Sequence, residues 1–161
     1  MPVWRALALV GLLLPLVPAT MHAQARRPGQ QSFLQSISAG PRAGRDFENH
    51  AWSLGGQASV PVGKNLELRP SGDVFFPEEG DKGWQLNGDA IVKSGSLYGG
   101  GGVAFAHPGD GETKTGYNLF FGLSAGASSG RTVPFLEFRW TFVNDTSPFR
   151  LALGFNYRVF Q

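Results

Sequence analysis

The sequence has no cysteine in its 161 residues, little net charge and, beyond its first 20 residues, no long apolar run. The absence of cysteine excludes disulfides, thiolate chemistry and a lipidated N-terminal cysteine. The 14 Lys and Arg residues nearly balance the 12 Asp and Glu residues. A charge so close to zero creates no strong field and gives no indication of nucleic-acid binding. Without a later run of about 20 apolar residues, any membrane insertion must use strands rather than helices.

The first residues have the three parts of a secretory signal peptide. A basic residue, Arg5, precedes the apolar run 6–17, and small residues follow at Ala23 and Ala25. This order is typical of a signal peptide cleaved after Ala23 or Ala25, and the apolar run is too short to span a bilayer as a helix. We therefore assign residues 1–23 to the signal peptide and residues 24–161 to one mature domain, against the alternative of a buried N-terminal helix.

The mature region alternates strand-like runs with turn-forming residues, and no window after the signal peptide has a helical apolar period. Its glycine content of 23 residues and aromatic content of 12% suit turns and closely packed strands. Each run has about the length that a tilted strand needs to cross a bilayer. We predict eight strands, at residues 32–40, 51–60, 66–76, 84–92, 97–106, 117–127, 133–143 and 149–160.

The last predicted strand is strongly amphipathic. Leu151, Leu153, Phe155, Tyr157 and Val159 share one face, and small, polar or charged residues occupy the alternate positions. Successive side chains of a strand point to opposite faces. A membrane barrel commonly ends on such a strand, because the last strand must pair with the first to close the sheet.

The connections between the predicted strands alternate in character along the chain. Short glycine-containing turns at 61–65, 93–96 and 128–132 alternate with longer, more charged connections at 41–50, 77–83, 107–116 and 144–148. Outer-membrane barrels have tight turns on the periplasmic side and longer loops outside. We therefore expect both chain ends on the periplasmic side.

One face of most runs is apolar and the other carries the charges. Placing Glu137 and Arg139 in lipid instead of Leu136 and Phe138 would cost roughly 2–4 kcal/mol for the arginine alone near the midplane. The apolar set should therefore face outward, and the charged set should meet in a narrow lumen as a plug of ion pairs, although an ion or proton path is the other interpretation. The predicted lumen cluster is Glu67, Arg69, Asp73, Asp89, Glu137, Arg139 and Arg158. Trp52, Trp84, Tyr117, Phe149 and Tyr157 are expected to form the interfacial aromatic girdles, although ordinary strand aromatics in a soluble core would read the same way.

With its signal peptide, eight amphipathic strands and alternating connections, the chain resembles the small outer-membrane β-barrel proteins of the OmpA/OmpX type. The resemblance covers essentially the whole mature chain and implies an all-β fold, an eight-stranded antiparallel up-and-down transmembrane β-barrel. It also implies a Gram-negative outer-membrane location and no OmpA-type peptidoglycan-binding domain, because the chain stops at the barrel.

The most specific part of the resemblance is an assembly signal in the last strand. Gly154, Tyr157 and Val159 match the family pattern of glycine, two residues, aromatic, any residue and hydrophobic. This pattern implies recognition by the barrel-assembly machinery. The chain departs from it where Phe160 is penultimate rather than last and where Ala152 replaces the usual polar residue.

No pattern in the sequence specifies catalysis, a metal or a cofactor, and we predict none of them. His50 or His107 could in principle act with Ser53, Asp110 or Glu112, but catalysis requires a mutual geometry that their spacing does not specify. The acidic segments 78–81 and 110–112 lack the EF-hand spacing, and we interpret them as solvated loop tips. Arg42, Arg45 and Lys114 could contact lipid phosphates.

We therefore expect a monomeric integral outer-membrane barrel with a structural or surface-interaction role. Its partners would be outer-membrane lipid and lipopolysaccharide, and the assembly machinery during insertion. Two alternatives are a barrel-type lipid-modifying enzyme and a soluble periplasmic, lipocalin-like binder of a small apolar ligand, whose apolar faces would point inward.

Overall fold

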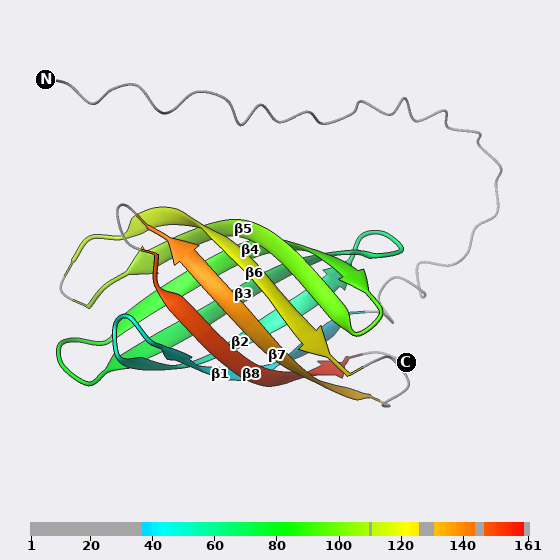
Figure 1. The fold of residues 1–161 in the computed structure, drawn as a ribbon, viewed down its shortest axis with the longest axis horizontal. Helices are drawn as coiled ribbons and strands as arrows, with labels where there is room; N and C mark the ends of the chain where they lie inside the picture. Colours follow the sequence, from blue (N-terminus) through cyan, green and yellow to red (C-terminus); the bar gives the residue numbers. More distant parts are fainter. Residues whose placement is uncertain (1–36, 110, 126–130, 144–146, 160–161) are drawn as a thin grey trace, which may run out of the picture.

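Eight antiparallel strands close into a barrel in the computed structural model, and each strand pairs with its neighbours along the chain (Figure 1). The structure describes residues 37–109, 111–125, 131–143 and 147–159, so the predicted signal peptide and Phe160 lie outside the described residues. No helix in these ranges is long and apolar enough to cross a membrane. The strands are β1 Ser38–Asp46, β2 Ala51–Pro61, β3 Leu66–Pro77, β4 Gly83–Ser94, β5 Leu97–His107, β6 Lys114–Ser124, β7 Thr132–Phe142 and β8 Phe149–Arg158.

This architecture confirms the predicted fold class, and the predicted start is exact or within three residues for every strand except the first. The prediction for β1 is wrong: the strand was placed at 32–40, with 41–50 as a loop, but it runs from Ser38 to Asp46. Its outward positions carry Pro41, Ala43 and Arg45 and therefore lack the apolar alternation that marks the other strands. Pairing with β2 and β8, rather than local pattern, defines this strand.

The connections lie at two opposite ends of the barrel (Figure 1). One end, which we call the turn end, carries connections 62–65, 95–96 and 125–131 together with the start of β1 and the end of β8. The other, the loop end, carries 47–50, 78–82, 108–113 and 143–148. Because β1 extends to Asp46, the first loop-end connection is as short as connection 62–65. The predicted contrast in loop length is therefore largely absent.

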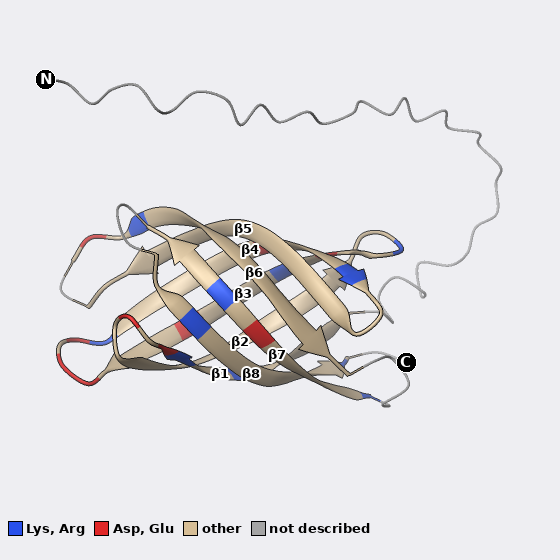
Figure 2. Ribbon diagram, in the orientation of Figure 1, with Lys and Arg blue, Asp and Glu red and all other residues tan. Residues whose placement is uncertain are grey.

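Polar residues face inward and apolar residues outward along the strands. Glu137 is 0% exposed, whereas the outward Leu54 and Leu119 are 59% and 57% exposed. Figure 2 shows charged positions near the middle of the barrel as well as in the loops. The predicted faces of the second, third, fourth, sixth, seventh and eighth strands agree with this pattern. In β5, whose faces the sequence left unassigned, Tyr98 and Ala104 point inward.

Candidate functional site

The barrel interior brings together five of the seven residues of the predicted lumen cluster. Arg69, Asp73, Asp89, Glu137 and Arg139 are buried and joined by ion pairs or through shared partners. The other two lie at the turn end. Glu67 pairs with Lys93, with 2.6 Å between Oε1 and Nζ, and Arg158 is the half-buried last residue of β8. The interior cluster is therefore smaller at that end than the sequence pattern suggests.

Glu137 is the centre of the interior ion pairs. Arg69 Nη1 lies 2.5 Å from its Oε2, and Arg139 Nη2 lies 2.9 Å from its Oε1. The hydroxyl of Tyr98 donates a third hydrogen bond to Oε2, at 3.1 Å. Arg139 also reaches Asp89, with 2.7 Å between Nη2 and Oδ2. These contacts connect strands β3, β4, β5 and β7 across the lumen, and they satisfy a carboxylate that no water reaches from outside.

A second cluster forms around Asp73 and contains two arginines that the predicted cluster omitted. Arg42 donates from Nε to Oδ1 at 2.7 Å and from Nη2 to Oδ2, and Arg150 Nη1 lies 3.1 Å from Oδ2. Arg42 Nη1 is also 3.9 Å from Glu137 Oε1, which links the two clusters. The suggestion that Arg42 contacts lipid phosphates is wrong, because Arg42 lies on the inward face of β1.

The charges that are buried inside the barrel balance. They are Arg42, Arg69, Arg139 and Arg150 against Asp46, Asp73, Asp89 and Glu137. Arg150 shares the inward face of β8 with Ala152 and Asn156. The alternation of that strand could therefore have identified it, whereas nothing in the local pattern of β1 indicated Arg42. Seven of these residues are joined to one another by ion pairs, whereas Asp46 is bonded to the β1–β2 turn. Balanced and paired charges are what burial of charge requires.

A chain of amide and hydroxyl groups continues from the ionic centre toward the loop end. Asn118 Nδ2 donates to Asp89 Oδ1 at 3.0 Å and to Asn87 Oδ1 at 2.9 Å. Thr141 donates to Asn118 Oδ1 at 2.9 Å, and Gln85 Nε2 donates to Asn87 Oδ1 at 2.5 Å. These side chains occupy the inward positions of β4, β6 and β7 and fill the lumen between the ion pairs and the mouth.

The turn end of the lumen is occupied by an apolar cluster of Ile91, Tyr98, Phe120 and Phe135. The Arg69 guanidinium lies 4.9 Å from the ring centre of Tyr98, 5.8 Å from that of Phe120 and 6.0 Å from that of Phe135. Each distance is within the range of a cation–π contact. The rings therefore cover the ionic centre on the side opposite the amide chain.

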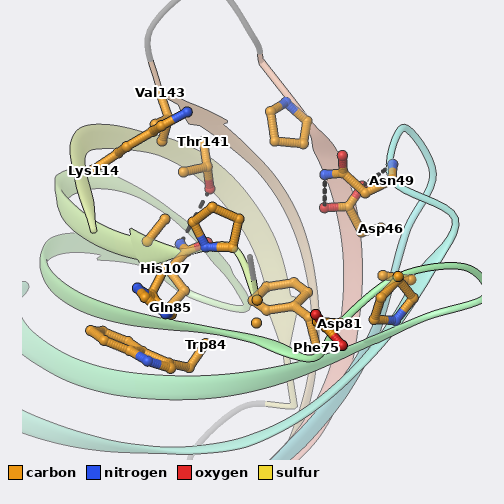
Figure 3. Close-up of a pocket in the computed structure, with 18 of the residues that line it drawn as sticks. Asp46, Asn49, Phe75, Asp81, Trp84, Gln85, His107, Lys114, Thr141 and Val143 are labelled. Atoms are coloured by element: carbon orange, nitrogen blue, oxygen red, sulfur yellow. Dashed lines mark hydrogen bonds between the residues drawn. The ribbon is translucent and has the colours of Figure 1, made fainter. Parts of the chain in front are cut away.

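The loop end of the barrel opens into a cavity of about 500 Å³. Gln85 and Thr141, which belong to the amide chain, line it together with Phe75. Figure 3 shows Lys114 and Val143 on one side of the cavity and Asp46 with Asn49 on the other. Asp46 accepts hydrogen bonds from the backbone N–H groups of Glu48 and Asn49, so its carboxylate stabilises the β1–β2 turn.

Among the described residues, no hydrogen bond joins either histidine of the mature region to Ser53 or Glu112, which the sequence suggested as partners. His107 stacks on Trp84, with ring centres 5.4 Å apart, and its Nδ1 is 3.2 Å from Thr113 Oγ1. His50 has a left-handed backbone, with a φ of 46°, in the β1–β2 turn. Ser53 is buried on the inward face of β2, and Asp110 lies outside the described residues. Within the described ranges, no three His, Asp or Glu side chains are placed to hold a metal ion.

Arg45 lies on the outward face at the loop end, next to an aromatic ring and an acidic residue. Its guanidinium is 5.2 Å from the ring centre of Trp52, and its Nη2 is 2.6 Å from Oε1 of Glu78. The hydrogen bond and the charge of Arg45 lower the pKa of the Glu78 carboxyl. Trp52 and Tyr117 are 60% and 62% exposed on the same outward surface. Their rings stand at the level where an interfacial girdle would lie.

The three residues of the predicted assembly signal do not lie on one face of β8. Tyr157 and Val159 are exposed on the outward side. Gly154 faces inward, directly opposite Phe135 of β7. The phenol oxygen of Tyr157 accepts a hydrogen bond from Arg131 Nη1 at 3.3 Å. Two residues of the signal therefore present side chains to the surroundings, and the third presents only backbone.

Comparisons with known proteins show the fold. No protein-family model and no curated protein sequence matches the chain. Among solved structures, it is similar to the N-terminal β-barrel domain of Pseudomonas aeruginosa OprF, with 18% identity and a TM-score of 0.65 over 76% of this chain and 96% of that one. Neisserial surface protein A is similar at 15% identity and a TM-score of 0.51, over 76% of this chain and 94% of that one. A de novo designed transmembrane β-barrel is similar at 17% identity and a TM-score of 0.53, over 76% of this chain and 94% of that one.

Proposed function

We propose that this protein is an integral outer-membrane barrel of a Gram-negative cell, with a closed lumen and a structural or surface-interaction role. One observation carries the proposal: the polarity of the barrel is inverted relative to a soluble protein. Charged side chains such as Glu137 and Arg139 are fully buried, while Leu54, Leu119 and Leu153 are more than half exposed. Water would penalise so large an outward apolar surface, whereas lipid tails would solvate it.

The contents of the lumen support a structural role rather than a diffusion pore. An eight-stranded barrel has an interior that side chains can fill. Here the ion pairs around Glu137 and Asp73 occupy the middle of the lumen. The amide chain lies on their loop-end side, and the aromatic cluster lies on their turn-end side. Gln85 and Thr141 of the amide chain line the cavity at the loop end. We infer that solutes do not cross, and that the surface at the loop end is the part available to partners.

We propose lipid and lipopolysaccharide as the surrounding partners, with insertion by the barrel-assembly machinery and a monomeric barrel as the product. The location of Arg45 on the outward face at the loop end, and of Lys114 beside the cavity there, supports contact with headgroup phosphates. Residues 1–23 would direct export as a signal peptide. The outward Tyr157 and Val159 are available for recognition during assembly.

Neither alternative gains support from the geometry. A lipocalin-like binder would direct its apolar faces inward, but here those faces point outward. A lipid-modifying enzyme would need a base beside a nucleophile or acid. Among the described residues, His107 contacts Thr113 and Trp84, and no hydrogen bond joins either histidine to Ser53 or Glu112.

Fractionation of expressing cells tests the proposal directly. The protein should remain in the membrane pellet after alkaline carbonate extraction. On SDS gels, unheated and boiled samples should migrate differently, because a closed barrel resists unfolding by detergent until heated. Release into the carbonate supernatant together with identical mobility of both samples would refute membrane integration.

A further inference from the structure

The ion pairs inside the barrel leave one positive charge in excess. They join four arginines to three carboxylates. The fourth buried carboxylate, Asp46, bonds to the β1–β2 turn with both of its oxygens. Its Oδ1 accepts from the backbone N–H groups of Glu48 and Asn49, and its Oδ2 accepts from the Asn49 side chain at 3.1 Å. Although Arg150 is its direct partner in the β1–β8 ladder, no ion pair joins the two side chains, both of which the structure describes.

Two of the four arginines face each other across neighbouring strands. Arg139 of β7 and Arg150 of β8 are directly opposite in the ladder, and both point inward. Side chains at directly opposite positions start about 5 Å apart, and like charges placed there repel each other. Arg139 bonds to Asp89 and Glu137, whereas Arg150 bonds to Asp73. The two guanidinium groups therefore share no carboxylate, and their repulsion is left without a common counter-charge.

Each of these two arginines also has a buried nitrogen without an acceptor. Among the described residues, no hydrogen-bond partner reaches Arg139 Nη1 or Arg150 Nη2, and both atoms are shielded from solvent. The residues are 0% and 4% exposed. A buried charged donor without an acceptor is costly. One small anion would accept from both nitrogens and would also supply the missing negative charge.

The cavity at the loop end lies next to this arginine pair. Thr141 lines the cavity and is the next inward residue after Arg139 on β7. Phe75 also lines it, and the ring centre of Phe75 is 5.1 Å from the Arg150 guanidinium. Asp46, opposite Arg150, completes this side of the lining, and Figure 3 shows the three residues around the same opening. A small solute that enters the cavity therefore comes close to the pair.

We propose that Arg139 and Arg150 bind one chloride ion, which accepts from Arg139 Nη1 and Arg150 Nη2. A monovalent anion makes the set of linked charges neutral. The cavity through which it enters is also lined by Asp46, Glu79 and Asp81. These carboxylates repel a divalent anion more strongly than a monovalent one, so they favour chloride over phosphate or sulfate. The bound ion would be a fixed part of the lumen, an anion site that goes beyond the structural role proposed above.

Reversible urea unfolding in lipid vesicles tests the site, with sodium chloride compared with sodium gluconate at equal ionic strength. An ion held only by the folded barrel lowers the unfolding constant by the factor 1 + [Cl⁻]/Kd. In about 300 mM chloride we expect a fall of roughly tenfold for the wild type, which corresponds to a Kd of about 30 mM. An unfolding constant that is equal in the two salts would overturn the proposal.

Arg150→Gln separates a binding site from a general effect of salt. The variant removes the excess charge and leaves three arginines linked with three carboxylates, and Asp73 keeps its two hydrogen bonds from Arg42. It should therefore fold and should lose the chloride effect. Lys93→Gln, the matched variant, removes a positive charge from the ion pair at the turn end and should keep the effect in full. Equal chloride effects in the wild type and both variants would overturn the site.

Bromide locates the ion and needs no variant. Crystals of the wild-type protein soaked in sodium bromide should give an anomalous difference peak between Arg139 Nη1 and Arg150 Nη2. Such a peak supports the site even if Arg150→Gln fails to fold. A water molecule at this position gives no anomalous signal, and that result would overturn the proposal. Peaks confined to the outer surface, an adventitious ion only, would overturn it as well.

Discussion

Glu67 and Glu137 both face inward from their strands, yet their surroundings differ greatly. Glu137 is surrounded by Arg69, Arg139 and Tyr98 and is completely buried. Glu67 lies at the turn end, where it forms an ion pair with Lys93, whose side chain is 35% exposed. An ion pair in the interior depends on every partner being present, whereas one at a wet rim contributes little. Strand alternation predicts the same inward orientation for both residues. Their surroundings differ because Glu137 lies deep in the barrel and Glu67 lies at its end.

We predict that Glu137→Gln lowers the free energy of unfolding by about 3–5 kcal/mol, because it leaves two buried guanidinium groups without their shared carboxylate. Glu67→Gln, the matched variant at the rim, should change it by about 0–1 kcal/mol. Reversible urea unfolding in lipid vesicles, followed by tryptophan fluorescence, measures both. A Glu67 effect as large as that of Glu137 would contradict the assignment of the ionic centre to Glu137.

The carboxyl of Glu78 should titrate below its ordinary range, because Arg45 donates a hydrogen bond to the charged form. A depressed pKa means that the stabilisation is present above the ordinary pKa and is lost as the pH falls through the depressed value. Carbon-detected NMR titration of the side-chain carboxyl in micelles measures the shift. In Arg45→Gln the pKa of Glu78 should rise, and an unchanged pKa would show that Arg45 is not its partner in solution.

At the scale of strands, β5 is the element whose inward and outward faces could not be assigned from the sequence, and the structure shows why it is rich in glycine. Its run Gly99–Gly102 has no side chains from which to assign a face. The inward glycines of the run lie opposite large side chains of neighbouring strands: Gly100 faces Phe120, and the space beside Gly102 is filled by Asp89. A narrow lumen can hold these side chains only where the adjacent strand has none.

The glycines of β4 and β5 should therefore differ in their tolerance of alanine. Gly100→Ala should destabilise the barrel by roughly 1–3 kcal/mol through overpacking, because its Cβ would lie 2.2 Å from the carbonyl oxygen of Ala90 and 2.8 Å from Cζ of Phe120. Gly88→Ala should be neutral to within about 0.5 kcal/mol, since its outward Cβ would meet only Val103, at 3.7 Å. Thermal loss of the compact form on unheated gels compares the two variants. Greater damage from the Gly88 variant would refute this account of the inward face.

At the scale of the whole molecule, the barrel is a closed sheet whose interior is divided into layers along its axis. An open cavity at the loop end is followed by the amide chain, the ion pairs and the aromatic cluster at the turn end. The layers share residues, because Gln85 lines the cavity and Arg69 contacts both the ion pairs and the rings. This layering supports our proposal that the lumen is closed and that the loop end is the surface available to partners.

Liposomes that carry the folded protein should therefore not swell in isotonic arabinose. The filled lumen leaves no space for a sugar, whereas a general diffusion pore would admit it within seconds to minutes. The heat-dependent gel shift of the same liposomes confirms that the barrel is folded. Swelling at the rate of a porin control would contradict the closed lumen.

The number of strands, the position of seven of them and the outward direction of the apolar faces of six could be predicted from the sequence alone. These properties follow from a local period of two residues and from turn residues between the runs, and both can be read without knowing which strands touch. Inward orientation also followed, because charge at Arg69, Asp73, Glu137 and Arg139 could not face an apolar environment.

The position of β1 and the pairing of the buried charges became known from the three-dimensional structure. Arg42 pairs with Asp73, 31 residues away, and Arg69 pairs with Glu137, 68 residues away. Such partners depend on the register and tilt of strands around the closed sheet, and no local pattern encodes them. The same holds for Gly154, which the last strand marks as part of an assembly signal. That it lies directly opposite Phe135 depends on the pairing of β7 with β8.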